Sequence, residues 1–559
     1  MRRLSFVLIA LVAFAAGSAF ARPMSTEEKI TDFRGLVAQI KSGYGPIRYK
    51  KEVIGIDIDV LAPKYEARIA ASTTNRDFYY AMAQFITEFR DGHFNAMIPT
   101  THQKTLPFMN DLVEGKVLID SIDRSQLSEA AFPFERGDEV VMFDGRPVGD
   151  VVSEIMTYVQ SGTELSVRRK SVWTLTLRRG SRLPVPVGTE IGETRIKHAR
   201  TGRVETVAAG VLKWIEAGEA LDEFDPAKER PLSVVKSLNT NYGVLSVREE
   251  YESLLGKNIE RSYACNPGTR IAIPEGATVL MNPPNGPFTA YYHYDARFGG
   301  NVGYLRIPDY SPQDELGNFA YEERFAQYQY AVDMLERNTV GLVIDQDHNC
   351  GGSVEYLEQM LGLFFTQQYK PTMFQLLATK ESYFDLKTWV DALPPFTIGR
   401  DRVQAVLNLV RTTAETRQSW LTTQTGITGR DFYQPNEVHY TKPIVVLADE
   451  MAGSGGDAFP SMLGFAMGGA VPRATLIGTQ TSGLGGHVQE MSPLYYSRFS
   501  GRLTKSLFYR ADGVPVENNG AVPSAENRYT PTYNDFVDGY REYQAFYLNK
   551  LLGLVKARR

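Results

Sequence analysis

Lys442-Pro-Ile-Val-Val-Leu-Ala448, followed by Asp-Glu-Met-Ala-Gly-Ser-Gly-Gly-Asp at 449–457, is the stretch that decides the fold. Its first part is a short, nearly continuous apolar run, which is typical of a strand buried on both faces of a parallel sheet. Its second part is a glycine-rich turn, and a helical pattern starts at Asp457. Such a turn presents Ser454 at the edge of the sheet, beside the N–H groups of a helix N-terminus.

The same alternation of strands and helices recurs on both sides of this stretch. The predicted strands lie at 302–307, 339–345 and 474–478, and the predicted helices at 318–337, 354–365 and 457–468. Near-continuous apolar strands that alternate with helices favour an α/β core, in which a parallel or mixed sheet is covered by helices. A chain of 559 residues is long enough for several such units.

The rest of the chain shows different patterns of apolar and polar residues. Residues 25–98 show helical periodicity, and a strand–turn–strand pattern around Asp144-Gly145 begins a region of short strands that includes 171–179. Residues from about 221 are rich in Asn, Pro and Gly and show no period. We therefore expect an N-terminal helical region at 22–106, a small β-domain at 107–220, a loop or insert at 221–297, the α/β core at 298–530 with a helical insertion at about 380–434, and a C-terminal helix within 531–559.

Residues 1–21 have the pattern of a secretory signal. Arg2 and Arg3 precede an uncharged apolar run over 4–16, and Ala19-Phe-Ala21 is a small-x-small cleavage site. The run is shorter than the roughly 20 residues that a spanning helix needs. We expect export to the periplasm or the exterior, with no membrane span after cleavage. A retained N-terminal anchor is the alternative.

Charge and cysteine content exclude several classes of function. The formal net charge is −5, and the chain has no basic run with interleaved aromatics, so we expect no nucleic-acid partner. Cys265 and Cys350 are its only cysteines, and no Cys/His cluster has the spacing of a zinc site. Neither a metal nor another cofactor is therefore expected. Spacing alone does not decide whether the two cysteines form a disulfide.

Two glycine-rich turns offer the groups that acyl transfer requires. Ser454, flanked by small residues, is a candidate nucleophile, and the N–H of Gly455 could bind an oxyanion. Asn349-Cys-Gly-Gly-Ser353 also follows a buried strand and would add the N–H of Gly351 or Gly352. The alternative for the first turn is a serine that only caps a helix. The alternative for the second is a simple strand-to-helix connection.

A serine nucleophile needs a base. An α/β-hydrolase would place an acid and then a histidine after the serine. His487 is the only histidine that follows Ser454. Asp457, in the first helical turn, is the only Asp or Glu between these two residues. That arrangement is improbable, which indicates a base from earlier in the chain. His93, just after a predicted helix, is well placed for this.

Five sequence blocks together resemble the C-terminal processing peptidase superfamily, which includes tail-specific proteases and the tricorn protease, and are most similar to the chlamydial protease-like activity factor group. These blocks are DGHFNAMI at 91–98, VGYLRIPDY at 302–310, GLVIDQDHNCGGSVEYL at 341–357, PIVVLADEMAGSGGDAF at 443–459 with ATLIGTQTSGLGG at 474–486, and DGVPVENNGAVP at 512–523. The stretch RGDEVVMFDGRPV at 136–148 is similar to a turn of PDZ domains.

The resemblance implies roles for particular residues. Tail-specific enzymes pair their serine with a lysine, and Leu484 occupies that position here, so the Ser–Lys dyad is absent. The other branch uses a histidine that matches His93, and a glutamate that matches Glu517 and orients the histidine or its water network. Cys350 replaces a proline of the family pattern, which puts the backbone of that loop in doubt. The resemblance also implies a homodimer, and removal of an inhibitory segment that corresponds to about 239–287.

The sequence therefore predicts an exported serine endopeptidase that acts on protein or peptide substrates, with Ser454 as nucleophile and His93 as base. The main alternative is a catalytically silent relative that binds peptides through its PDZ-like domain. Such a relative should have lost Ser454, His93 or the glycines, and all are present. An esterase or lipase is the third hypothesis, and the missing Ser-Asp-His order argues against it.

Overall fold

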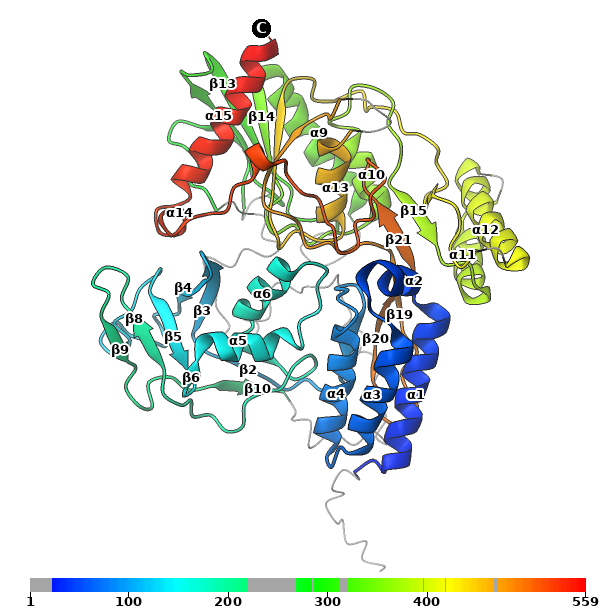
Figure 1. The fold of residues 1–559 in the computed structure, drawn as a ribbon. Helices are drawn as coiled ribbons and strands as arrows, with labels where there is room; N and C mark the ends of the chain where they lie inside the picture. Colours follow the sequence, from blue (N-terminus) through cyan, green and yellow to red (C-terminus); the bar gives the residue numbers. More distant parts are fainter. Residues whose placement is uncertain are drawn as a thin grey trace, which may run out of the picture.

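Three units meet around one site in the computed structural model, which describes residues 23–218, 268, 270–283, 286–311, 320–395, 397–417, 419–466 and 471–558 (Figure 1). The signal predicted at 1–21 lies outside the described residues, as does most of the predicted inhibitory segment. None of the helices in the described ranges is long and apolar enough to cross a membrane.

The first unit is a bundle of helices. Ser25 caps its first helix, because the side chain accepts the N–H of Glu28. The core contains Phe33, Phe78 and Phe85, together with Phe499 from the far end of the chain. The helices are α1 (Thr26–Gly43), α2 (Ile47–Tyr49), the π-helix η1 (Lys50–Ile54), α3 (Ile58–Ala70) and α4 (Asn75–Thr87).

The second unit is a small β-domain with two helices. Asp144 and Gly145 both have positive φ, which is the backbone of a two-residue hairpin turn. The main sheet has the order β3-β4-β5-β8-β9, with β6 paired to β5, and a second sheet has the order β10-β2-β7. The elements are β2 (Gln103–Thr105), β3 (Phe108–Val113), β4 (Lys116–Ile122), β5 (Glu139–Phe143), β6 (Arg146–Pro147), α5 (Val148–Met156), α6 (Glu164–Trp173), β7 (Leu177–Arg179), β8 (Arg195–Lys197), β9 (Val204–Thr206) and β10 (Ile215–Ala217).

The strand predicted at 171–179 is wrong over most of its length. Helix α6 continues through Trp173, and only Leu177–Arg179 forms a strand. Buried positions of α6 include Ser166 and Arg169, spaced as on one face of a helix. Three of its five buried residues, Ser166, Arg169 and Ser171, are polar, so the helical period was invisible in the apolar pattern.

The third unit contains the predicted α/β sheet, in the order β11-β12-β13-β14-β17-β18. The last four strands are parallel, and β11 and β12 join antiparallel at one edge. Helices α9, α10 and α13 cover one face and α15 the other (Figure 1). The elements are β11 (Thr278–Met281), β12 (Ala290–Asp295), β13 (Gly300–Arg306), α9 (Tyr321–Asn338), β14 (Gly341–Asp345), α10 (Val354–Leu361), β17 (Ile444–Ala448), α13 (Gly455–Gly464), β18 (Thr475–Gly478) and α15 (Arg541–Arg558).

Strands β11 and β12 correct the predicted extent of the insert. Residues 278–295 were expected to belong to the loop at 221–297, yet they pair with the main sheet. The Pro- and Gly-rich run at 282–287 connects these two antiparallel strands, so its turn formers mark a hairpin-like connection rather than a long loop.

The remaining elements connect the units. Strand β20 pairs with β1, which places Arg502 opposite Asn95 and joins the late chain to the segment after α4. The helical insertion predicted at about 380–434 contains α11 and α12. These elements are β1 (Asn95–Met97), β15 (Met373–Leu376), α11 (Lys380–Ala392), α12 (Ile398–Thr416), β16 (Thr425–Gly426), β19 (Val488–Glu490), β20 (Ser500–Thr504), β21 (Ser506–Tyr509), the 3₁₀ turn η3 (Ala525–Asn527) and α14 (Tyr533–Val537).

Candidate active site

Ser454 lies in the turn between β17 and α13, one residue before the helix. Its backbone has φ 60° and ψ −114°, a conformation that residues other than glycine rarely adopt. A serine that only caps a helix has an extended backbone, so capping does not account for this conformation. A strained strand-to-helix turn is how α/β-hydrolases expose their nucleophile. The backbone therefore favours a nucleophile at Ser454.

Asp457 holds this turn in place. Its carboxylate accepts the N–H groups of Ser454 (2.7 Å), Gly483 (2.8 Å) and Leu484 (3.0 Å), and also the hydroxyl of Thr481. Burial raises the pKa of Asp457 to about 6, against the lowering effect of the four hydrogen bonds. Asp457 thus ties the Ser454 turn to the segment 481–484. Sequence reasoning considered it only as an improbable triad acid.

His93 follows α4 on a tight turn organised by Asp91. One carboxylate oxygen of Asp91 accepts the N–H groups of His93 (2.8 Å) and Phe94 (3.2 Å). The other accepts the hydroxyls of Tyr44 (2.9 Å) and Thr504 (2.7 Å). Because Asp91 is fully buried, these bonds fix the backbone that carries the imidazole. Only the position of Asp91, two residues before His93, could have indicated this role.

The electrostatics keep the His93 ring neutral. Burial lowers the pKa of His93 below its usual 6.5; the charge of Asp91 and a hydrogen bond with the backbone of Gly486 raise it, and Arg502 and Lys170 lower it further. Its Nδ1 is buried and has no hydrogen-bond partner among the described residues. A neutral imidazole is the form that accepts a proton from a serine.

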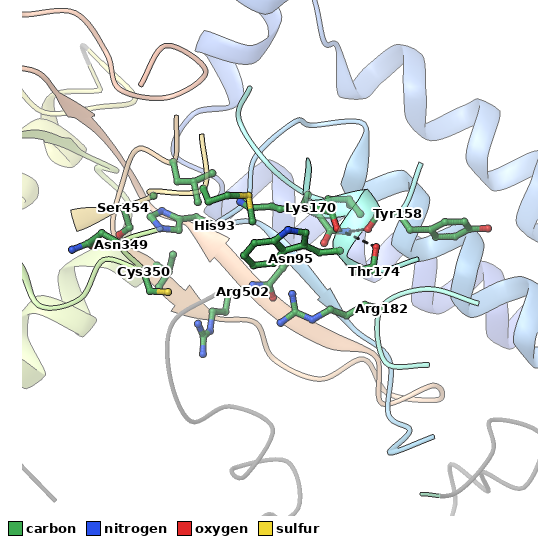
Figure 2. A pocket seen from close by; sticks show the side chains of 18 of the residues that line it. His93, Asn95, Tyr158, Lys170, Thr174, Arg182, Asn349, Cys350, Ser454 and Arg502 are labelled. Carbon is green, nitrogen blue, oxygen red and sulfur yellow. Dashed lines mark hydrogen bonds between the residues drawn. The ribbon is translucent and has the colours of Figure 1, made fainter. Parts of the chain in front are cut away.

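Ser454 and His93 line one cavity of about 370 Å³. Figure 2 shows their side chains at one end of this cavity, with Asn349 and Cys350 beside them. The nucleophile comes from the third unit and the base from the first, and Lys170 of α6 contributes from the second. The structure thus places the two principal predicted residues in one site, although they are far apart in the sequence.

The three predicted oxyanion glycines are distinguished by their hydrogen bonds. The N–H of Gly351 donates to Asn349 Oδ1 (2.8 Å) and is already occupied. Gly352 lines the cavity, and Gly455 is the first residue of α13, where N–H groups have no partner within the helix. These contacts favour Gly352 and Gly455 over Gly351 as oxyanion donors.

The approach of these turns explains why glycines are required. A Cβ on Gly351 would lie 2.6 Å from Ser454 Cβ, and one on Gly455 would lie 2.7 Å from the ring of Tyr310. Any larger residue would therefore push the two glycine-rich turns apart.

Glu517 does not hydrogen-bond to His93. Its buried carboxylate pairs with Lys50 and accepts the N–H of Gly485 (3.0 Å). Burial and the neighbouring Asp91 raise the pKa of Glu517 to about 8, while Lys50 opposes them. Glu517 therefore supports the segment beside the site, and Asp91 is the carboxylate that contacts the His93 turn. Sequence reasoning missed Lys50 because it lies in no motif.

Leu484, at the position of the family's lysine, is a packing residue. A Cβ on Gly92 would lie 2.6 Å from the Leu484 side chain, and a Cβ on Gly453 would lie 2.8 Å from it. Leu484 therefore packs between the turn of the base and the turn of the nucleophile. It contributes shape to the site rather than a proton acceptor.

Other polar residues around the site have separate partners. Cys350 lines the cavity and is disulfide-bonded, whereas Cys265 lies outside the described residues. His487 also lines the cavity, and its Nδ1 is 2.8 Å from Ser506 Oγ. In the described part of the chain, no group of three or more His, Cys, Asp or Glu side chains is arranged to hold a metal ion.

A buried ionic cluster joins the second unit to the third. Arg169 of α6 contacts Asp111 of β3 (2.7 Å) and reaches Asp449 (3.2 Å) and Glu450 (3.0 Å) of the α/β unit. Asp449 in turn accepts the backbone N–H of His348 (2.8 Å), the residue before Asn349. Arg169 and Asp449 therefore link the small β-domain to the loop that carries Gly352.

Removing this arginine should loosen the docking of the two units. Arg169→Met leaves Asp111, Asp449 and Glu450 buried with one cation fewer, and breaking such a cluster costs about 3–5 kcal/mol of stability. Urea unfolding measures the loss. The control is Arg195→Met, whose pair with Glu193 is half-exposed and should change stability by under about 1 kcal/mol. Equal stability of both variants would contradict a structural role for the cluster.

Comparison with known proteins assigns the two larger units. Residues 102–222 match the PDZ domain family, and residues 301–526 match peptidase family S41. A protein of Chlamydia pneumoniae is 22% identical, covering 96% of this chain and 93% of its own length. An uncharacterized protein of Chlamydia muridarum is 24% identical, covering 97% and 96%.

Solved structures confirm the fold. Mature CPAF complexed with lactacystin superimposes with a TM-score of 0.72 at 22% identity, covering 94% of this chain and 99% of that one. A further structure of mature CPAF gives the same TM-score and identity over 94% and 98%. The predicted α/β fold with a PDZ-like domain is thus confirmed, and the match to peptidase family S41 confirms the predicted superfamily. The chain is a serine-type peptidase that carries a family S41 domain at residues 301–526, preceded by a PDZ domain at residues 102–222.

Proposed function

We propose that this peptidase cuts internal peptide bonds by a Ser–His mechanism, with Ser454 as nucleophile and His93 as general base. The observation that carries the proposal is the strained backbone of Ser454 at the N-terminus of α13, facing the same cavity as the neutral His93. A silent peptide-binding relative would have no need to maintain that strain.

The reaction follows from these positions. His93 takes the hydroxyl proton of Ser454 while Oγ bonds to the carbonyl carbon of the substrate. The N–H groups of Gly352 and Gly455 stabilise the oxyanion. His93 then gives its proton to the amine nitrogen as the C–N bond breaks, which leaves an acyl-enzyme. A water molecule loses a proton to His93, attacks the ester carbonyl, and Ser454 regains its proton as the acid product leaves.

The test is incubation of the purified chain with an unfolded protein, followed by mass spectrometry of the fragments. We expect cuts at internal bonds, and none from Ser454→Ala prepared in parallel. Release of single residues from chain ends only, or equal cutting by both preparations, would contradict an endopeptidase that uses Ser454.

The same spectra report self-processing. The resemblance implies an inhibitory segment at about 239–287, and two similar structures are of mature CPAF. A tethered segment has a high effective concentration at the cleft, about millimolar for short linkers. We expect the wild-type chain to be cut in or beside this segment and Ser454→Ala to stay whole. Full activity of an uncut chain would contradict a zymogen and leave the peptidase mechanism standing.

Export and a homodimer complete the proposal. Export rests on the signal pattern at 1–21, and the homodimer rests on the resemblance alone. Both stay predictions.

A further inference from the structure

The catalytic cavity is lined by cations. Lys170 of α6, Arg179 of β7, Arg182 and Arg502 of β20 line it together with Ser454 and His93. Neither Asp nor Glu is among the residues that line it within the described ranges. This contrasts with the whole chain, whose 65 acidic residues outnumber its 60 basic ones.

These cations lie close enough to act on each other and on the base. Burial lowers the pKa of Lys170 to about 8; Arg182 adds to this lowering, while Asp457 and Asp449 oppose it. Arg502 and Lys170 both contribute to the low pKa of His93. Figure 2 shows Lys170, Arg182 and Arg502 around the cavity that also contains Ser454 and His93.

Two of these cations have contacts beside the cavity. Lys170 Nζ is bonded to two neutral hydroxyls, Ser161 Oγ (3.0 Å) and Ser482 Oγ (3.5 Å). Arg502 pairs with Glu490 (3.2 Å), whose side chain is half-exposed to solvent. Because no carboxylate of the described residues lines the cavity itself, an anion that entered it would meet several positive charges in a partly enclosed site.

The rest of the lining suits a peptide. The apolar surface of the same cavity comes from Trp173, Leu177, Leu183 and Met451. A segment that combines acidic and apolar side chains would match both features, since each carboxylate meets a cation and each apolar side chain leaves water.

We propose that the cleft selects substrate segments that carry an acidic side chain, Asp or Glu, near the scissile bond, and that Lys170, Arg182 and Arg502 determine this preference. The proposal rests on the peptidase function and names its substrate class. The shared chemistry is a peptide carboxylate, which could also be a free C-terminus, and the experiment separates the two sources.

The test uses a peptide that the enzyme cuts, resynthesised with acetylated and amidated ends. Glu, Gln or Lys is placed in turn at each position around the cut, and kcat/KM is measured for each. We expect at least one position where Glu exceeds Gln by about 10- to 100-fold, the range of one charge-assisted hydrogen bond. This ratio should shrink between about 0.05 and 0.5 M salt. Equal rates, or a preference for Lys, at every position would overturn the proposal.

Variants assign the preference to the cavity. Lys170→Gln, Arg182→Gln and Arg502→Gln should each lower the Glu/Gln ratio, and Arg182→Glu should shift it towards Lys. The control is Arg541→Gln, an exposed arginine of α15, which should leave the ratio unchanged. A ratio that no cavity variant alters would overturn the assignment. A preference seen only in peptides with a free C-terminus would also overturn the assignment.

A binding measurement separates this inference from the mechanism. Fluorescence anisotropy with Ser454→Ala reports affinity for the same labelled peptides when the chemistry is removed. Tighter binding of the Glu peptides supports the preference even if no peptide is cut, which would contradict the proposed mechanism alone. Cleavage without any charge preference in rate or binding overturns this inference and leaves the mechanism intact.

Discussion

Ser454→Ala is expected to lower kcat for peptide hydrolysis by about 10⁶-fold, because the nucleophile and its base act as one unit. The substitution removes only the hydroxyl group, and the backbone N–H of residue 454 still donates to Asp457. The fold should therefore persist. Stability should be nearly unchanged, because alanine has the same Cβ and places the same strain on the backbone at this position. Steady-state kinetics with a cleaved peptide, together with thermal unfolding, measures both effects.

A second serine of the same helix provides the matched control. Ser461 is buried in α13, and its hydroxyl donates to the carbonyl of Ala458 within the helix. Ser461→Ala removes the same atom from the same element, away from the cavity, and should retain activity. Near-normal turnover by a folded Ser454→Ala chain would refute the assignment of the nucleophile.

His93→Ala is expected to lower kcat nearly as far, because Ser454 without a base is a weak nucleophile. The double variant should be no slower than either single one. His439→Ala is the control, since that ring is bonded to the carbonyl of Asn436 in the loop that precedes β17. Additive losses in the double variant would indicate that the two residues work independently.

The pH profile identifies the base. His93 must be neutral to accept a proton, and burial lowers its pKa below 6.5. The wild-type kcat/KM should therefore hold through neutral pH and fall only below pH 6.5, on the acid side. Asp91 raises this pKa, so Asp91→Asn should move the acid limb to still lower pH. An acid limb above pH 7 would instead indicate an amine as base.

The sequence predicted the parts of this molecule that apolar periodicity and glycine turns encode. The strands around 341–345 and 444–448 and the placement of His93 after a helix follow from local pattern. Prediction from the sequence failed where buried polar groups decide the structure. Helix α6 was misjudged because its inner face contains Ser166 and Arg169.

Long-range pairing was equally invisible in the sequence. Glu517 was expected to orient His93 or its water network, and nothing in the sequence indicated its buried partner Lys50, 467 residues earlier. Asp457 joins two turns by backbone N–H groups, which every residue type except proline possesses, so no side-chain motif announces it. The cationic lining draws on α6, β7 and β20, and only the tertiary fold brings these segments to one cavity.

The N-terminal helices share their core with residues from 491–503, and this has a consequence for biosynthesis. Met491, Leu494, Phe499 and Leu503 complete the apolar interior of the N-terminal bundle, and β20 pairs with the strand just after His93. A nascent chain emerges from its N-terminus first, so these helices lack part of their interior until residues 491–503 have left the ribosome. The base cannot be fixed opposite the nucleophile before then. Synthesis of these late residues is therefore the step at which the site can first assemble.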